Sequence, residues 1–333
     1  MVEKTKKQHY VPQSYLKNWD INKENNNKPK VFSYDIKQDK QFPVNIEDTA
    51  TRKYFYDYEK YSREEIEIIY NNIPKEFQIS KEDFFIKQGI EKLIFAEKIE
   101  NISIQTIISI IKKLEELKVN PKENINKKNI LSTTDKVILS YFISIQYTRT
   151  KEFRDKSQNL YNEIIEDIKE HSKGTIDIEH IDNNENKFIH LRDMFSHANS
   201  IQKILLKYKW ILYRNSTKVP YITSDNPVVK KPNLKGIFDN YGIGSFGFES
   251  EGIEIRLPLS PKYELIIHEP RYLKKKHTKK FEKIHIIDND VENVLYSNVL
   301  LIQFSNYLYS IENNFDVIKN AISQNPDLII YTP

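Results

Sequence analysis

Residues 137–171 read VILSYFISIQYTRTKEFRDKSQNLYNEIIEDIKEH, and this stretch decides the fold class of the chain. Its apolar residues recur every three to four positions, which is the spacing of one face of an α-helix. There is no proline between Pro121 and Pro220 and no glycine between Gly89 and Gly174. Because these two residues are the usual helix breakers, we expect one long helix from about Thr133 to about His171.

The segments on either side of this helix complete the secondary-structure prediction. Residues 102–117 and about 188–208 predict two more helices. From Lys209 onward, short runs rich in Ile, Leu and Tyr predict an antiparallel sheet, at residues 209–214, 220–225, 253–259 and 263–269. Helices are expected again at 291–311 and 315–323, followed by a terminal strand at 328–332. The strand-like pieces 9–11 and 30–36 could join the same sheet.

Together these segments predict an α+β fold, with an antiparallel sheet from the N-terminal and C-terminal segments and a large helical middle region. A chain of 333 residues is long enough to bury its own core. We expect a single domain over residues 1–333. It divides into an N-terminal strand segment (1–60), a helical region (61–208), a sheet-rich region (209–285), and C-terminal helices and a strand (286–333).

The composition excludes several classes of protein. The chain contains no cysteine, which rules out thiol nucleophiles, iron–sulfur clusters and disulfide frameworks. Its histidines lack the helical spacing of a zinc site, so zinc, haem and nicotinamide cofactors are not expected. The 51 basic and 47 acidic residues give a net charge of +4, which is too small to indicate nucleic-acid binding by itself. Without a secretory signal or a membrane span, we expect a cytoplasmic protein with no membrane partner.

The first candidate site is the N-terminal segment QHYVPQSYLKNW, which contains His9-Tyr10-Val11-Pro12. It places His9 on a short strand, and Pro12 suits the first turn of the helix that follows. A histidine in this position can be a general base. The alternative is a partly buried ring whose nitrogens are satisfied by the main chain.

The second candidate is Ser224-Asp225-Asn226-Pro227, within YITSDNPVV. An apolar strand delivers these polar residues into a turn, where Asp225 could be a metal ligand or could orient a histidine. The alternative is that Asp225 and Asn226 only form the turn, because both side chains bond readily to their own backbone before a proline.

The third candidate is QYTRTKEFRD, which carries Arg149, Lys151 and Arg154 inside the long predicted helix. Only eight of the 51 basic residues are arginines, and arginine offers a bidentate fork that lysine lacks. Five residues correspond to about 140° around a helix, so Arg149 and Arg154 can grip one ligand only if the helix bends or the ligand is wide. The alternative is a solvated face with salt bridges to neighbouring acids.

Two further segments have weaker signals. Five of the seven glycines lie between Gly236 and Gly252, so we expect a mobile loop there. Its Gly242, Gly244 and Gly247 match G-x-G-x-x-G without the helix that dinucleotide binding requires. Glu254 could complete a metal-nuclease motif with Asp225 or Asp239, although Arg256 occupies the usual lysine position. The basic run 271–285 contains Tyr272 and Phe281, which could stack on bases.

Taken in order, several pieces of the chain resemble the bacterial domain-of-unknown-function family numbered 4238. They are QHYVPQSYLKNW, KYFYDYE, QYTRTKEFR, KWILYR, YITSDNPVV, RLPLSPKYELII and NVLYSNVLLIQFSNYLY. The resemblance implies that nine residues occupy the family's motif positions: His9, Tyr10, Pro12, Arg149, Arg154, Ser224, Asp225, Asn226 and Pro227. Trp19 and Lys151 stand where Phe and Pro are expected. The family carries no established activity to transfer.

A shared site explains so many polar motif residues better than packing does, and the hypothesis that follows is nucleic-acid hydrolysis by a toxin or antiviral effector. His9 would be the base, Arg149 and Arg154 would grip phosphate, and Asp225 would orient His9 or hold Mg²⁺ or Mn²⁺. Four more residues would contribute to binding: Tyr10, Lys151, Ser224 and Asn226. The alternative is a non-catalytic sensor that recognises a protein or small ligand. Either hypothesis requires the motifs to converge.

Overall fold

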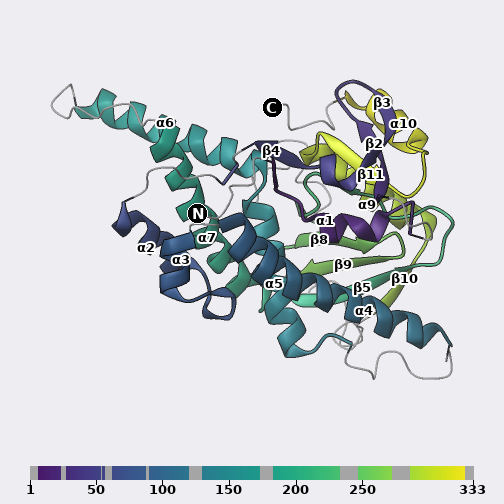
Figure 1. Ribbon diagram of the computed structural model, residues 1–333. Coiled ribbons are helices and arrows are strands. Elements are labelled where there is room, and N and C mark those ends of the chain that lie inside the picture. The colour runs from purple at the N-terminus through teal and green to yellow at the C-terminus, as the bar shows by residue number, and fades with distance from the viewer. Residues whose placement is uncertain are drawn as a thin grey trace.

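The computed structural model describes residues 7–23, 28–53, 55–56, 62–87, 90–119, 130–172, 183–232, 247–271 and 286–326. The helices of the middle region lie on one side of the protein, and the strands from the two ends of the chain lie on the other (Figure 1). This arrangement confirms the α+β class and the helical middle region. In the described part of the chain, no helix is both long and apolar enough to cross a membrane.

The helical middle region contains six α-helices and one π-helical segment among the described residues. They are α2 (Arg63–Asn72), α3 (Lys81–Lys87), η4 (Ile90–Glu100, the π-helical segment), α4 (Asn101–Val119), α5 (Thr133–Thr148), α6 (Lys151–Ser172) and α7 (Asn183–Leu205). The helices predicted at 102–117 and 188–208 correspond to α4 and α7. Helix α5 begins with a capping box between Ser132 and Asp135, which satisfies two main-chain donors at the helix start.

The prediction of one uninterrupted helix from Thr133 to His171 is wrong, because the chain breaks into α5 and α6 at Arg149 and Thr150. Arg149 has φ −92° and ψ 4°, outside the helical region. The Thr150 hydroxyl accepts the main-chain N–H of Phe153 at 3.2 Å, so Thr150 caps the start of α6. Two residues earlier, the Thr148 hydroxyl donates to the carbonyl of Met194 on α7 at 3.1 Å.

The strands form three sheets among the described residues. The five-stranded sheet has the order β10-β5-β9-β8-β7. Its strands are β5 (Lys209–Asn215), β7 (Val229–Pro232), β8 (Ile253–Ser260), β9 (Tyr263–His268) and β10 (Ile286–Asn289). All its pairings are antiparallel except β10 with β5.

The four-stranded sheet has the order β3-β2-β11-β6 and joins the two ends of the chain. Its strands are β2 (Lys30–Asp35), β3 (Lys40–Asn45), β6 (Thr223–Ser224) and β11 (Tyr307–Ser310). A two-stranded ribbon pairs β1 (Lys7–His9) with β4 (Thr51–Lys53). The expected antiparallel sheet from both ends is therefore confirmed, but the N-terminal strands do not join the sheet of β5, β8 and β9. They pair with each other and with β11.

The C-terminal segment differs from its prediction in one place. Helix α9 (Val291–Leu300) passes through a 3₁₀ turn (Leu301–Phe304) into β11, so the expected helix at 291–311 ends early. The stretch YLYS is apolar enough for helix or strand, and β2 and β6 on its two sides make it a strand. Helix α10 (Asp316–Gln324) follows as expected. The strand predicted at 328–332 lies outside the described residues.

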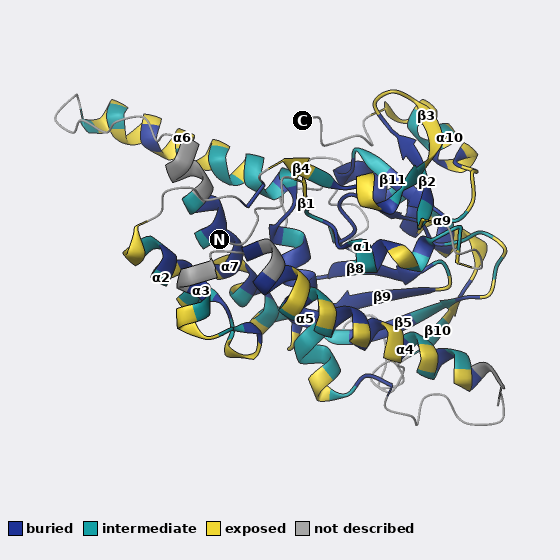
Figure 2. Ribbon diagram, viewed as in Figure 1, coloured by how far each residue is buried: buried dark blue, intermediate teal, exposed yellow. Residues whose placement is uncertain are grey.

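The two faces of the five-stranded sheet differ in character. One face carries Ile255, Leu257, Leu265 and Ile267, which are buried in the main hydrophobic core with residues of α5 and α7 (Figure 2). The other, here called the α9 face, is covered by α9 and carries polar side chains: Lys209, Tyr213, Lys231, Glu254, Arg256, Glu264 and His268. Alternate residues of a strand point to opposite faces, so Lys230 and Lys231 of β7 point in opposite directions.

The break between α5 and α6 yields a first testable prediction. Replacing Thr150 by alanine removes the hydroxyl that caps α6 and is expected to lower the free energy of unfolding by about 1 kcal/mol. Urea denaturation followed by circular dichroism measures this loss. Thr150→Ser keeps the hydroxyl and is the matched control. If serine and alanine destabilise the protein equally, the hydroxyl does not hold the break.

Candidate functional site

Tyr10 is the residue on which the sequence motifs converge. Its main-chain carbonyl accepts hydrogen bonds from Nε of Arg149 at 2.7 Å and from Nε2 of Gln146 at 2.8 Å. Its phenol hydroxyl donates to Oδ2 of Asp225 over a longer distance of 3.5 Å. The segment that begins at His9 is therefore held between the end of α5 and the loop that follows β6.

Arg149 lies wholly inside the protein, with 0% of its surface exposed. Its Nη1 donates to Oε1 of Glu100 at 2.8 Å, and its guanidinium carbon lies 5.1 Å from the centre of the Phe95 ring. Nη2 is buried without a hydrogen-bond partner among the described residues. A buried guanidinium requires a paired charge, which makes Glu100 an essential partner. Sequence reasoning missed Glu100, because nothing local marks it.

Asp225 is buried and bonded mainly to the backbone. Its Oδ1 accepts the main-chain N–H groups of Asn306 at 3.0 Å and Tyr307 at 3.2 Å. Burial raises the pKa of Asp225 to about 6, although these two N–H donors act in the opposite direction. No bond joins Asp225 to His9 among the residues that the structure describes, so the predicted orienting contact is replaced by one to Tyr10. Nor do the described His, Asp and Glu residues form a group of three able to hold a metal ion.

Ser224 and Asn226 are also buried and serve the same junction. The Ser224 hydroxyl accepts the main-chain N–H of Asn226 at 3.0 Å, which forms the predicted turn. Nδ2 of Asn226 donates to Oε2 of Glu152 at 2.8 Å and to the carbonyl of Phe304 at 3.1 Å. The other carboxylate oxygen of Glu152, Oε1, accepts a hydrogen bond from Nζ of Lys156 on the next turn of α6. Asn226 thus ties the loop after β6 to the first turn of α6, an attachment that the sequence did not reveal.

His9 differs from these motif residues because it is only partly buried. Burial lowers its pKa to about 4; a hydrogen bond to the backbone of Glu47 opposes this shift, and the positive charges of Arg149 and Lys7 add to it. The imidazole is therefore uncharged at neutral pH. Gln13 follows His9 by four residues, and its Nε2 atom lies 3.4 Å from Nδ1 of His9.

The ribbon of β1 and β4 places cations beside His9. Lys7 lies opposite Lys53, and His9 lies opposite Thr51. Because alternate residues of a strand share a side, these four residues occupy one face of the ribbon. Lys7 and Lys53 are exposed, and Lys7 is paired with Asp48. The ribbon therefore presents an uncharged imidazole beside a cross-strand pair of lysines.

Arg154 and Lys151 lie in the first turns of α6 and are both partly buried. The guanidinium carbon of Arg154 lies 5.2 Å from the centre of the Phe55 ring, and Nη1 donates to the Phe55 carbonyl at 3.4 Å. The neighbouring Tyr56 donates its hydroxyl to the carbonyl of His9 at 3.4 Å. Arg154 and His9 therefore flank the same pair of aromatic residues. Arg149 does not, since its guanidinium faces Phe95 and Glu100.

His190, on α7, lies against the same aromatic residues from the inside. Its ring meets Phe55 edge-on, with 5.7 Å between the ring centres. Both ring nitrogens are buried without a hydrogen-bond partner in the described part of the chain. Burial lowers the pKa of His190 to about 3, with a contribution from the positive charge of Arg154. From the sequence, His190 was considered only as one of the histidines that lack the spacing of a zinc site.

The predicted mobile loop is described only at its end. Gly242, Gly244 and Asp239 lie outside the described residues, as does the basic run after Arg271. Gly247 opens a turn in which its carbonyl accepts the main-chain N–H of Ser250 at 3.2 Å.

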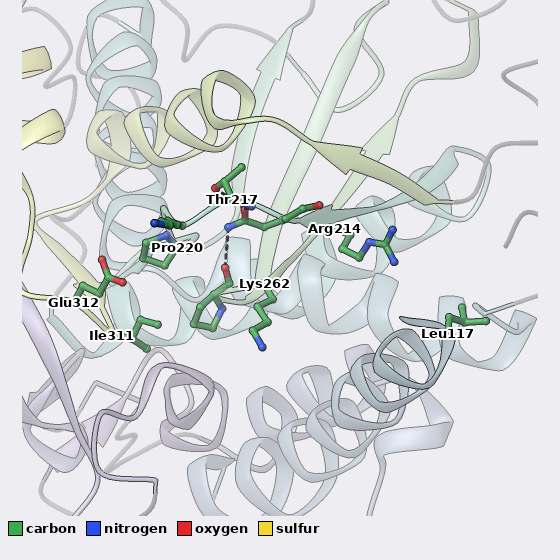
Figure 3. A pocket seen from close by; sticks show the side chains of 11 residues that line it. Leu117, Arg214, Thr217, Pro220, Lys262, Ile311 and Glu312 are labelled. Carbon is green, nitrogen blue, oxygen red and sulfur yellow. Dashed lines mark hydrogen bonds between the residues drawn. The ribbon is translucent and has the colours of Figure 1, made fainter. Parts of the chain in front are cut away.

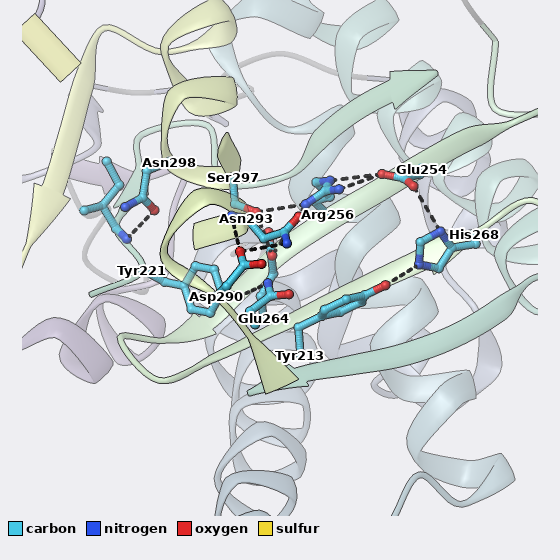
Figure 4. A network of polar contacts seen from close by, with 12 residues as sticks. Tyr213, Tyr221, Glu254, Arg256, Glu264, His268, Asp290, Asn293, Ser297 and Asn298 are labelled. Carbon is cyan, nitrogen blue, oxygen red and sulfur yellow. Dashed lines mark hydrogen bonds and ion pairs between the residues drawn. The ribbon is translucent and has the colours of Figure 1, made fainter. Parts of the chain in front are cut away.

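A second polar cluster lies on the α9 face, where the sequence had singled out only Glu254 and Arg256. Arg256 donates from Nε and Nη2 to Oε2 of Glu254, at 3.2 and 2.7 Å, and from Nη1 to the Ser297 hydroxyl at 2.8 Å (Figure 4). Ser297 in turn donates to Oε2 of Glu264 at 2.9 Å. Burial raises the pKa of Glu264 to about 7, although Arg256 opposes this shift. In the sequence, the signal for this cluster was that the charged residues Glu254 and Arg256 alternate with apolar residues in one strand.

A cavity of about 730 Å³ lies apart from both clusters, at the turns that follow β5, β8 and β11 (Figure 3). Three basic side chains line it, those of Arg214, Lys218 and Lys262. Arg214 is already engaged, because it forms two hydrogen bonds with Asp288. None of the motif residues lines this cavity.

The comparisons with known proteins agree with the motif resemblance. The family model described as "Protein of unknown function (DUF4238)" matches residues 7–310. The match covers most of the 333 residues, so this chain belongs to the DUF4238 family. No curated protein and no solved structure matches the chain. The matched range contains every motif residue that the structure brings to Tyr10.

The buried pair of Arg149 and Glu100 yields the second prediction. Arg149→Met leaves the Glu100 carboxylate without its cation and is expected to lower the free energy of unfolding by about 3 kcal/mol or more. Urea denaturation measures the loss. Arg192→Met is the matched control, because the Arg192 side chain is 37% exposed and, in the described part of the chain, pairs only with its neighbour Asp193. Its expected loss is below about 1 kcal/mol. Equal losses in the two variants would contradict the structural role of Arg149.

The third prediction concerns acid stability. Between the ordinary pKa of 6.5 and the folded value of about 3, the unfolded chain binds a proton at His190 that the folded chain does not. His190 therefore lowers the free energy of unfolding as the pH falls through this range, by up to about 1.4 kcal/mol per pH unit. His9 acts in the same direction down to about pH 4. Asp225 acts in the opposite direction between its ordinary 3.8 and about 6.

His190→Phe is expected to remove the contribution of His190 and to lose less stability than the parent protein between pH 6.5 and pH 4. Urea denaturation at several pH values measures the difference. His171→Phe serves as the control, since His171 is an exposed residue of α6. Parallel pH profiles for the parent and His190→Phe would show that His190 is not held uncharged.

Proposed function

We propose that this protein is a nucleic-acid hydrolase in which His9 is the general base. The observation that carries the proposal is the state of the His9 imidazole. The residue is partly exposed although its Nε2 atom is buried, its pKa is lowered to about 4, and it lies on the same ribbon face as the Lys7–Lys53 pair. An uncharged imidazole accepts a proton at neutral pH, and flanking cations attract the phosphates of a nucleic acid.

The cations around His9 suit an extended substrate. Lys7 and Lys53 are exposed on the same face of the β1–β4 ribbon as His9, and Lys151 and Arg154 lie on α6. A nucleic acid repeats its charge along the strand, so separated cations can contact successive phosphates. This favours a polymer over a compact anion.

The proposed step uses His9 to take the proton from the attacking hydroxyl, which is either water or the 2′-hydroxyl of RNA. A new O–P bond forms, the P–O bond to the leaving oxygen breaks, and that oxygen takes a proton from water while His9 releases its own to solvent. The nearby cations stabilise the charge on the phosphoryl oxygens. Arg149 and Asp225 are positioning residues in this scheme, because both act through Tyr10. A divalent ion such as Mg²⁺ or Mn²⁺ would add a further positive charge at the phosphate.

A non-catalytic binding protein remains the second candidate function, and the burial of the motif residues favours it. Arg149, Ser224, Asp225 and Asn226 are all buried, and the hydrogen bonds that they form among the described residues are within this chain. Motif residues that only hold a junction together would equally serve a sensor that recognises a protein or small ligand without catalysis. The experiment below separates the two.

The fourth prediction tests His9 directly. Purified protein is incubated with single-stranded DNA and RNA in Mg²⁺, in Mn²⁺ and in EDTA, and cleavage is followed on gels. His9→Gln is expected to reduce the rate by about 100-fold or more, whereas His171→Gln on the exposed face of α6 is expected to leave it unchanged. The rate should rise as the pH increases through about 4, where His9 loses its proton, and then level off.

Two outcomes would overturn this proposal. Folded parent protein that cleaves neither polymer in any of the three conditions favours the sensor. Cleavage that His9→Gln leaves intact removes His9 from the mechanism. A toxin or antiviral effector should also arrest the growth of cells that express it, and His9→Gln should relieve the arrest.

A further inference from the structure

The α9 face contains a chain of three side chains that the function proposed above does not use. The Tyr213 hydroxyl lies 3.2 Å from Nε2 of His268, and Nδ1 of the same ring lies 3.2 Å from Oε1 of Glu254. The three residues come from β5, β9 and β8, and their side chains lie across the sheet in one row (Figure 4). A hydroxyl, an imidazole and a carboxylate in this order form the relay that activates a hydroxyl as a nucleophile.

Arg256 fixes the state of this relay. It forms two hydrogen bonds with Oε2 of Glu254, which leaves Oε1 for His268. Burial alone would raise the pKa of Glu254, but Arg256 and His268 together bring it to about 2. Glu254 is therefore ionised and accepts the Nδ1–H of His268. In the neutral tautomer with Nδ1 protonated, the lone pair of Nε2 faces the Tyr213 hydroxyl, as a general base requires.

The surroundings of the relay favour an anionic substrate. Lys209 lies opposite His268 in the register of β5 with β9, and Lys231 lies opposite Glu254 in the register of β7 with β8. Residues directly opposite each other in an antiparallel pair point to the same face, so both lysines belong to the α9 face. Tyr213, Lys209 and Lys231 are all partly exposed, whereas His268 and Glu254 are buried. Burial raises the pKa of the Tyr213 phenol, so the hydroxyl depends on His268 to take its proton.

We propose that Tyr213 is the nucleophile of a second reactive centre, which takes a phosphoryl group from a phosphate ester onto its phenol oxygen. The phenol proton passes to Nε2 of His268 as the new O–P bond forms, and it passes on to the leaving oxygen as the old P–O bond breaks. Water then hydrolyses the tyrosyl phosphoester, with His268 accepting the proton from water and returning it to the phenol oxygen. Lys209 and Lys231 neutralise the phosphoryl oxygens.

The fifth prediction uses bis(p-nitrophenyl) phosphate as the probe, because its leaving group is coloured and departs without protonation. The parent protein is expected to release a burst of p-nitrophenolate, and intact-mass analysis should detect one aryl phosphoryl group on the protein. Tyr213→Phe is expected to abolish both signals. Tyr296→Phe is the matched control: Tyr296 is an exposed residue of α9 that lies beside Lys231 and outside the relay.

Two more variants separate catalysis from folding. His268→Gln is expected to slow the burst by about 100-fold or more. Glu254→Gln acts through His268, so it should slow the burst and leave its amplitude unchanged, whereas a partly unfolded protein would lose amplitude. Circular dichroism checks that each variant is folded.

The failure of this proposal is distinguishable from the failure of the nuclease proposal. His9→Gln should leave the burst and the mass adduct intact, since the β1–β4 ribbon is separate from the α9 face. The proposal is overturned if the folded parent protein forms no adduct, or if an adduct persists in Tyr213→Phe. In either case the row of side chains serves only to hold α9 against the sheet.

Discussion

The guanidinium of Arg149 lies in the break between α5 and α6, and the arrangement of the motif region depends on it. Arg149 contacts the carbonyl of Tyr10 and the carboxylate of Glu100, which come from the N-terminal segment and from η4. A buried charge cannot be left unpaired without a large cost in free energy. The three segments are therefore fixed together, and Tyr10 is brought to the point where Asp225 reaches it from the opposite side.

Most helices and strands could be predicted because their signals are local. Apolar spacing identified α4, α5, α7 and the strands β2, β5, β8 and β9. The break at Arg149 could not be predicted in this way, since apolar residues continue at helical spacing across it and there is no glycine or proline. Thr148 and Arg149 instead bond to Met194 and Tyr10, which lie far away in sequence. Likewise, YLYS became a strand because β2 and β6 lie beside it.

The candidate site could be predicted only in outline. The order of the motifs indicated the residues that meet at Tyr10, but the direction of each side chain depends on partners that no motif contains. Asp225 bonds to the main chain of Asn306 and Tyr307 because the register of β6 with β11 places those N–H groups there. On the α9 face, strand alternation revealed Glu254 and Arg256, whereas the position of His268 depends on the pairing of β8 with β9.

Strand β7 runs between the polar region around Tyr10 and the polar cluster on the α9 face. Its position constrains the number of residues in the segment that precedes it. Lys230 lies 5.5 Å from the ring centre of Tyr147 on the helical side, and Lys231 lies 4.0 Å from that of Tyr296 on the α9 side. Strand alternation makes these directions depend on residue count. One inserted or deleted residue between Asn226 and Val229 would exchange the two lysines between faces, while the anchored loop stayed in place. The directions of the two lysines therefore constrain the number of residues in this segment.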